Sequence, residues 1–328
     1  MYANETDRLA ITAKSLSKTY AGGIEALKGI DLQLNYGQVL ALLGPNGSGK
    51  TTTVNILATI TRPDDGDVVV AGADLRANPA GVRERIGVAG QFVSVDNMLT
   101  GRENLTLVGR LNHLRKADCA DRVAELVAQF DLADFADRRA ATYSGGMRRR
   151  LDLAAAIIAQ PQVLMIDEPT TGLDPRSRLQ VWDSVTRLVT SGAAVLLTTQ
   201  YLEEADRLAD NVLILDYGRV VAEGTPTELK KLVGGTVIEV TFPDEESAQS
   251  GSLVMSAREH VVKGAVIRVS GLEDADAALP AVISELSAAN LPLTAVQLRF
   301  PTLDDVFLEL TGKPEGADSD KTLSGLGH

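Results

Sequence analysis

The sequence contains little cysteine, histidine or aromatic side chain. Among its 328 residues are one cysteine, three histidines and 4% aromatic residues. A single cysteine, Cys119, excludes an internal disulfide and is typical of proteins in a reducing compartment. We expect Cys119 to be an unreactive residue of a helix.

Long apolar runs are missing as well. None reaches the roughly 20 residues of a membrane-spanning helix, and the first residues lack the basic and apolar regions of a signal peptide. We therefore expect a protein that is either soluble or held at a membrane by a partner. Basic residues are in deficit, and the net charge of −12 argues against a broad nucleic-acid surface.

A glycine-rich stretch follows the apolar run 39–43 and opens into a helical pattern. Its residues are Gly44, Pro45, Asn46, Gly47, Ser48, Gly49, Lys50 and Thr51, with Thr52 after them. Strand, glycine-rich turn and helix in this order predict a phosphate-binding loop. The glycines let backbone N–H groups point into one concavity, Lys50 brings charge to the terminal phosphates, and the Thr51 hydroxyl is a Mg²⁺ ligand. The alternative is an ordinary Gly/Ser turn, which both flanks disfavour.

Apolar strands alternate with helical patterns through the first two thirds of the chain. We predict strands at 9–15, 30–35, 67–70, 86–89, 163–166 and 194–198, helical pattern at 100–130, 144–159 and 175–191, and a hairpin at 211–216 and 219–222. Buried strands that alternate with helices predict an α/β fold with a parallel sheet covered on both faces.

The composition changes after about residue 235. We predict strands at 237–242, 265–269 and 295–299, with helices at 275–289 and 301–310. The predicted domains are an α/β domain over residues 8–235 with a helical subdomain at about 95–158, a small α+β accessory domain over 236–312, and a disordered tail over 313–328.

An acidic pair, Asp167 and Glu168, ends the apolar strand at 163–166. At the end of a buried strand downstream of a phosphate loop, Asp167 is placed to hold Mg²⁺ and Glu168 to polarise an attacking water. The alternative is an acidic pair that only begins a loop before Pro169.

The segment Tyr143-Ser144-Gly145-Gly146-Met147 resembles the signature of the ATP-binding-cassette (ABC) family, usually Leu-Ser-Gly-Gly-Gln. This resemblance carries three further positions. Gln91 matches the family's glutamine loop, which touches Mg²⁺, and 171–174, which ends in Asp174, looks like its D-loop. Tyr20 matches the aromatic that stacks on adenine, an interaction worth about 1–3 kcal/mol.

The family resemblance implies a P-loop NTPase core of ABC type with an antiparallel β subdomain and a helical subdomain. It implies a head-to-tail homodimer in which Lys50, Thr51, Gln91, Asp167 and Glu168 of one copy hold Mg²⁺ and ATP. Ser144, Gly145 and Gly146 of the other copy close on the γ-phosphate. The signature is itself a hydroxyl and a glycine pair at a predicted helix N-terminus, which is a second anion site.

Two departures from the family pattern narrow the resemblance. Gln200 stands where the family has a histidine that contacts the γ-phosphate, and the signature has Tyr143 and Met147. The glutamine amide can donate a hydrogen bond to phosphate, but it cannot take up a proton or carry a positive charge. We therefore expect slow ATP hydrolysis. These two positions, together with the segments 147–152, 199–206 and 301–312, resemble the corresponding sequences of the daunorubicin-resistance subgroup of ABC ATPases.

Members of that subgroup are ATPase subunits that pair with an integral membrane permease and export anthracycline-like drugs or lipids. The resemblance therefore implies a peripheral protein on the cytoplasmic face of the cell membrane, with no nucleic-acid partner. The alternatives are a regulatory ABC protein with weak hydrolysis and a non-transport ABC ATPase. We expect an interfacial or solvated role for the basic run 148–150 and a packing role for Trp182.

Overall fold

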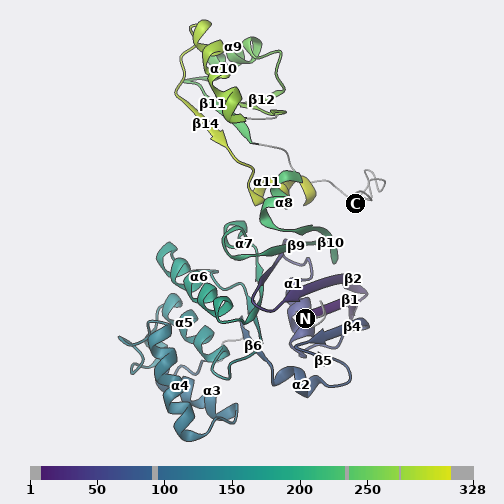
Figure 1. The fold of residues 1–328 in the computed structure, drawn as a ribbon, viewed down its shortest axis with the longest axis vertical. Coiled ribbons are helices and arrows are strands. Elements are labelled where there is room, and N and C mark those ends of the chain that lie inside the picture. The colour runs from purple at the N-terminus through teal and green to yellow at the C-terminus, as the bar shows by residue number, and fades with distance from the viewer. Residues whose placement is uncertain (1–8, 91–94, 233–235, 273–274, 312–328) are drawn as a thin grey trace, which may run out of the picture. The chain divides into compact units, whose positions relative to one another are not determined.

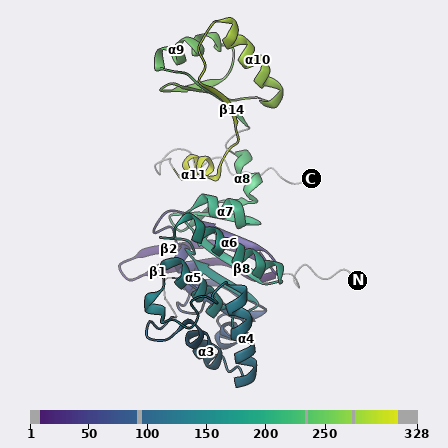
Figure 2. The same ribbon diagram turned by 90° about the vertical axis from the view of Figure 1, so that its left-hand side faces the viewer.

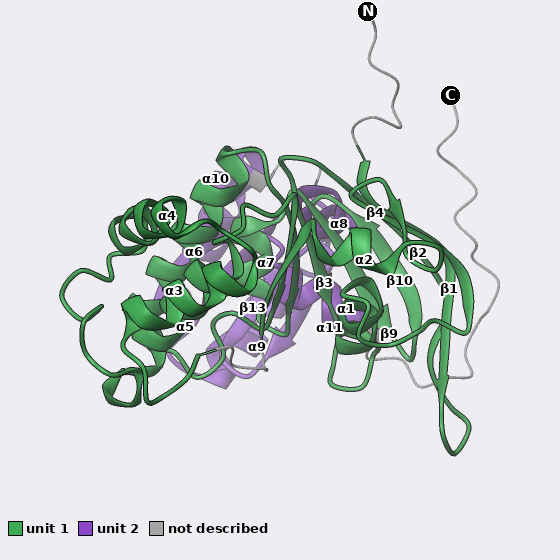
Figure 3. Ribbon diagram, turned by 90° about the horizontal axis from the view of Figure 1, so that it is seen from below, with its two compact units in different colours: residues 1–225 green, residues 226–328 purple. Residues whose placement is uncertain are grey.

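The computed structural model describes residues 9–90, 95–232, 236–272 and 275–311. The chain forms two compact units, residues 1–225 and 226–328, coloured separately in Figure 3. Each unit has its own core. None of the helices in the described ranges has both the length and the apolar character of a membrane span.

A six-stranded sheet forms the centre of the first unit, with the strand order β10-β9-β3-β8-β7-β6. Its strands are β3 (Val39–Leu43), β6 (Ile86–Ala89), β7 (Val163–Asp167), β8 (Ala194–Thr199), β9 (Asn211–Asp216) and β10 (Arg219–Gly224). All neighbours are parallel except the hairpin of β9 and β10. Every residue of β3, β7 and β8 is buried, because both faces of the sheet are covered. The predicted α/β fold is confirmed.

One face of this sheet packs against helix α1 (Lys50–Leu57) and a second, antiparallel sheet with the order β2-β1-β4-β5. Its strands are β1 (Leu9–Tyr20), β2 (Ile24–Asn35), β4 (Asp65–Val70) and β5 (Ala73–Asp74). The first two are longer than predicted. They extend past the buried region as an exposed ribbon, interrupted by bulges, where burial no longer imposes an alternating pattern. The short helix α2 (Pro79–Arg83) and β5 were not predicted.

The other face is covered by helices. These are α3 (Gly101–Leu111), α4 (Lys116–Gln129), η2 (Ala140–Thr142), α5 (Gly145–Ala156) and α6 (Pro175–Thr190), followed by the short α7 (Leu202–Leu208). Within the first unit, Figure 1 shows α3 to α5 on the side of the six-stranded sheet opposite β1 and β2. The helical pattern at 100–130 is two helices, because the chain turns at His113, whose φ is 63°.

The second unit contains the order β11 (Val237–Thr241), α9 (Glu245–Val254), β12 (His260–Lys263), β13 (Val266–Val269), α10 (Ala275–Ala288) and β14 (Ala295–Arg299). The strands form an antiparallel sheet with the order β12-β13-β11-β14, which is the ferredoxin-like arrangement. Figure 2 shows α9 and α10 beside this sheet, and both contribute to its one core. Neither α9 nor β12 was predicted.

Helix α8 (Pro226–Leu232) lies in the second unit, where it packs against α11 (Leu303–Thr311). The structural division therefore falls before α8, at residues 225 and 226, whereas the predicted boundary follows this helix. The predicted tail at 313–328 lies outside the described residues.

Candidate nucleotide-binding site

The phosphate loop connects β3 to α1, and its glycines are required by its geometry. A Cβ at Gly44 would overlap the carbonyl oxygen of Leu215 and the hydroxyl of Ser48. Gly49 has a φ of 112°, and a Cβ there would lie 2.7 Å from the carbonyl oxygen of Ala26. The loop can therefore curl tightly into the N-terminus of α1 only without side chains at these positions.

Lys50 lies inside this curl and is 5% exposed. Its Nζ donates to the carbonyl oxygens of Gly44, at 2.6 Å, and Pro45, at 3.0 Å. Burial lowers the pKa of Lys50, and the charges of Glu168 and Asp167 act in the opposite direction. A buried cation within a ring of backbone groups at a helix N-terminus fits the phosphates of a nucleotide. The buried Ser48 hydroxyl, which has no hydrogen-bond partner in the described part of the chain, adds a donor to this cradle.

Asp167 and Glu168 lie at the carboxyl end of β7, separated from the phosphate-loop strand only by β8. The hydroxyl of Thr198 on β8 donates to Asp167 Oδ1, which orients this 7% exposed carboxylate. Glu168 has a φ of 48°, its N–H donates to Thr198 O at 3.0 Å, and its Oε2 accepts from the Thr171 hydroxyl at 3.1 Å. The fold thus gathers Lys50, Asp167 and Glu168 at the same edge of the sheet.

Two further predicted residues meet beside α1. The hydroxyl of Tyr20, at the end of β1, donates to the Thr52 hydroxyl at 3.5 Å. Tyr20 is 39% exposed, and Lys18 Nζ lies 5.8 Å from the centroid of its ring. An exposed aromatic face next to the phosphate loop is a surface on which a base can stack.

The signature residues begin α5. Ser144 is its N-cap, and the Ser144 Oγ accepts from the N–H of Met147 at 3.3 Å. The first turn of α5 has no acidic residue, so it keeps the positive end of its dipole. Gly146 is packed so closely that a Cβ would overlap the Ser177 hydroxyl, while Gly145 is exposed.

A cavity of about 300 Å³ lies between this helix and the acidic pair. It is lined by Gly145, Arg149, Asp167 and Glu168, together with the D-loop residues 171–173. The signature helix and the Glu168 carboxylate of one chain therefore border the same space.

Three predicted site residues remain, namely Asp174, Gln200 and Gln91. Asp174 caps α6, since its carboxylate accepts from the N–H of Ser177 at 3.0 Å and from the Ser177 hydroxyl at 2.6 Å. The sequence Asp-Pro-x-Ser is itself a signal for such a cap. Gln200 is exposed just after β8, and Gln91 lies outside the described residues. Nucleotide contacts of these three residues stay predictions.

Sequence reasoning missed two buried residues next to the site. The Arg149 side chain is only 12% exposed, so a solvated role for the whole run 148–150 is wrong at this position, and an interfacial role stays a prediction. Trp182 does more than pack, because its Nε1 donates to the fully buried carboxylate of Glu204 at 2.9 Å. The contact between Trp182 and Glu204 has no signal in the local sequence, since the two residues lie on different helices.

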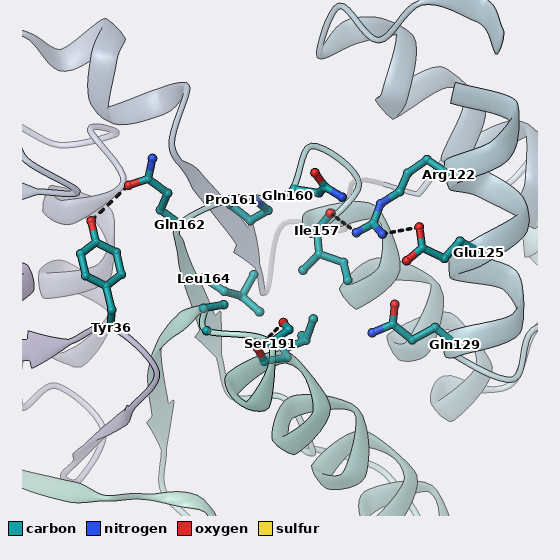
Figure 4. A pocket seen from close by; sticks show the side chains of 13 residues that line it. Tyr36, Arg122, Glu125, Gln129, Ile157, Gln160, Pro161, Gln162, Leu164 and Ser191 are labelled. Carbon is teal, nitrogen blue, oxygen red and sulfur yellow. Dashed lines mark hydrogen bonds and ion pairs between the residues drawn. The ribbon is translucent and has the colours of Figure 1, made fainter. Parts of the chain in front are cut away.

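A second cavity, of about 410 Å³, lies at the opposite end of the strands (Figure 4). It is bordered by Tyr36, Gln162 and Ala193, which precede β3, β7 and β8. The Tyr36 hydroxyl donates to Gln162 Oε1 at 3.1 Å. This cavity is therefore separate from the nucleotide site, which is built from the carboxyl ends of the same strands.

Comparisons with known proteins agree with this geometry. The model of the ABC transporter family matches residues 27–171, and a model described as "ATP-binding protein DrrA1-3-like, C-terminal domain" matches residues 224–311. The chain is 47% identical over 309 residues to the daunorubicin/doxorubicin resistance ATP-binding protein DrrA of Streptomyces peucetius, covering 93% of each protein. It is 45% identical over 315 residues to the doxorubicin resistance ATP-binding protein DrrA of Mycobacterium tuberculosis, covering 94% of this chain and 95% of that protein. It is 36% identical over 301 residues to the Nod factor export ATP-binding protein I of Cupriavidus metallidurans, covering 92% and 96%.

Solved structures show the same fold. An ATP-binding subunit of an ABC transporter superposes with a TM-score of 0.62 at 28% identity, covering 68% of this chain and 92% of that one. A dimeric ATP-binding cassette in a post-hydrolysis state with ADP and Pi gives a TM-score of 0.60 at 25% identity, covering 66% and 98%. The chain therefore belongs to the ABC transporter family, as an ATP-binding ATPase subunit of the daunorubicin- and doxorubicin-resistance group.

Proposed function

We propose that this chain hydrolyses ATP to drive export of a hydrophobic, anthracycline-like drug or a lipid through a separate membrane permease. The functions for which its relatives are named, which include drug resistance and Nod factor export, support a cargo of this kind. The proposal of ATP hydrolysis rests on one observation, which is that Lys50, Asp167 and Glu168 lie together at one edge of the sheet.

Each of these side chains has a role that follows from its chemistry. Lys50, buried in the loop, binds the terminal phosphates, and the backbone N–H groups at the start of α1 bind the remaining phosphate oxygens. Glu168 is held at the end of β7 to polarise an attacking water. Asp167, Thr51 and Gln91 offer the oxygen ligands that Mg²⁺ prefers, and a bound Mg²⁺ would neutralise charge on the phosphates.

We propose that the complete site needs a second copy of the chain. Ser144 and Gly145 are exposed at the N-terminus of α5, Gly146 follows them, and the first turn has no acidic residue, which suits the γ-phosphate of ATP held by the partner copy. The related cassette solved as a dimer with ADP and Pi supports this arrangement. ATP would then join two copies, and its hydrolysis would release them.

The permease would hold this dimer peripherally at the cytoplasmic face of the cell membrane. The second candidate function is regulatory ATP binding with weak hydrolysis. It is favoured by Gln200, which offers an amide where the family pattern has an imidazole.

The test compares the purified protein with Glu168→Gln in an ATPase assay with Mg²⁺ and by gel filtration with ATP. We expect turnover in the unmutated protein, and an ATP-stabilised dimer with only a small residual turnover in Glu168→Gln. Absence of turnover in the unmutated protein would favour the regulatory function.

Export is tested in inverted membrane vesicles that contain the co-expressed permease. ATP should drive uptake of doxorubicin or a fluorescent lipid with the unmutated chain and not with Glu168→Gln. Equal uptake with both chains would contradict the export proposal.

A further inference from the structure

Arg149, in the second turn of α5, donates to the backbone of two other segments of the site. Its Nε donates to Pro169 O at 3.0 Å, its Nη2 to Asp167 O at 3.0 Å, and its Nη1 to Gly90 O at 3.4 Å. Gly90 directly precedes Gln91, and the other two carbonyls stand on either side of Glu168. One guanidinium thus joins the signature helix to the ends of β6 and β7.

The backbone between these carbonyls is strained. Glu168 has a φ of 48°, a left-handed conformation that is unfavourable for a non-glycine residue and persists only where its surroundings impose it. The hydrogen bond from Glu168 N to Thr198 O fixes the residue from the side of β8. The two bonds from Arg149 fix it from the side of α5. Together these contacts hold the Glu168 carboxylate at the edge of the sheet.

Arg149 is also the charged centre of a buried cluster. Its Nη1 pairs with Asp152 Oδ2 at 3.0 Å, and that carboxylate is 4% exposed. Burial lowers the pKa of Arg149, while the charges of Asp152, Glu204 and Asp167 act in the opposite direction. Glu204 lies in the first turn of α7, four residues after Gln200, so the cluster extends from the signature helix to the segments that follow β7 and β8. Burying a charge this deeply is costly, and a hydrophobic side chain would serve packing alone better.

We propose that Arg149 is a positioning residue for ATP hydrolysis, which holds Glu168 in its reactive place and couples its loop to the signature helix. The inference rests on the proposed role of Glu168 as the residue that polarises water. A movement of Ser144 and α5 towards a nucleotide on a second copy would then be transmitted to Glu168 within the same chain. A misplacement of about 1 Å in such a site can cost about a hundredfold in rate.

The neighbouring Arg150 provides a matched control on the same helix. Its Nη1 donates to the carbonyl oxygens of Phe130, at 3.3 Å, and Asp131, at 3.1 Å, and its guanidinium lies 5.2 Å from the Phe135 ring centroid. The two bonds to carbonyl oxygens are of the same kind as those of Arg149, and all of these contacts stay within the helical subdomain. Lysine at either position keeps the charge but lacks the planar fork that reaches several carbonyls at once.

The test measures ATP turnover, KM, nucleotide affinity and thermal stability of Arg149→Lys and Arg150→Lys. We expect kcat of Arg149→Lys to fall by about ten- to a hundredfold with KM and the Kd of a fluorescent ATP analogue nearly unchanged. Arg150→Lys should keep its kcat. An unchanged kcat in Arg149→Lys, or an equal fall in both variants, would overturn the inference. If Arg149→Lys does not fold, Arg149→Gln, whose amide keeps one donor group, serves for the same measurements.

A double-mutant cycle separates positioning from a general structural effect. If Arg149 acts through Glu168, adding Arg149→Lys to Glu168→Gln should not lower the residual turnover further, whereas an additive loss would contradict this route. Failure of the proposed function has a different signature. An inactive unmutated protein, or a Glu168→Gln variant with full turnover, would refute the role of Glu168 itself.

Discussion

Replacement of Glu204 by glutamine should make the protein more stable at neutral pH. The Glu204 carboxyl is fully buried, and its Oε1 accepts the indole N–H of Trp182 at 2.9 Å. Burial raises its pKa above the ordinary 4.5, while the hydrogen bond from Trp182 and the charge of Arg149 act in the opposite direction. Burial is the larger effect, so the folded protein retains a proton that the unfolded chain loses.

The size of the effect follows from this retained proton. Between pH 4.5 and the raised pKa of the folded state, the native protein binds one proton more than the unfolded chain. Its free energy of unfolding therefore decreases by about 1.4 kcal/mol for each pH unit of increase in that window. The stabilising contribution is complete below pH 4.5 and is lost as the pH rises through the folded-state pKa. Glutamine keeps an oxygen acceptor for Trp182 and has no proton to lose, so Glu204→Gln should lack this pH dependence.

The assay is urea unfolding at several values from about pH 5 to about pH 8. Trp182 is the sole tryptophan of the chain, and its fluorescence therefore reports on the first unit. Glu203→Gln, at the exposed neighbouring position, is the matched control and should follow the unmutated protein. Stability curves for Glu204→Gln that run parallel to those of the unmutated protein would refute the reasoning.

Three further outcomes can be checked directly. Gln200→Ala should lower ATP turnover much more than Gln200→His, because both glutamine and histidine donate a hydrogen bond to phosphate; equal turnover of all three proteins would exclude a catalytic role for residue 200. Gly146→Ala should destabilise the first unit by about 1–3 kcal/mol in urea titrations, since its Cβ would overlap the Ser177 side chain, and a gain in stability would contradict the close packing. Leu286→Ala should destabilise the second unit by about 2–5 kcal/mol, because Leu286 is fully buried in its core; unchanged hydrogen exchange of the β11 and β13 amides would speak against this.

The α/β class and the phosphate loop could be predicted because their signals are local. The residues from Gly44 to Thr51 are contiguous, and the strands β3, β7 and β8 each contain a continuous apolar run because both faces of the sheet are covered. The roles of Asp167 and Glu168 could be predicted because a buried apolar strand directly precedes them. In each case the chemistry and the element that positions it are adjacent in the chain.

Exposed or short elements had no such signal. The outer halves of β1 and β2 leave the buried region, so their side chains need not alternate between apolar and polar. Helix α9 buries mainly small residues, Ala248 and Gly251, and α2 has only five residues. Periodicity detects one-sided burial, and these segments bury too little to produce it.

The sequence by itself determined that this chain belongs with nucleotide-binding proteins, and it predicted which loop holds the phosphates. Only the tertiary structure decided how that loop is joined to the rest of the site. Arg149 reaches carbonyls 18 and 20 residues further along the chain and one 59 residues before it, and Trp182 meets Glu204 across 22 residues. Backbone carbonyls carry no sequence identity, and a buried pair forms only when separate elements pack together. For that physical reason the contacts that position Glu168 had to be read from the fold.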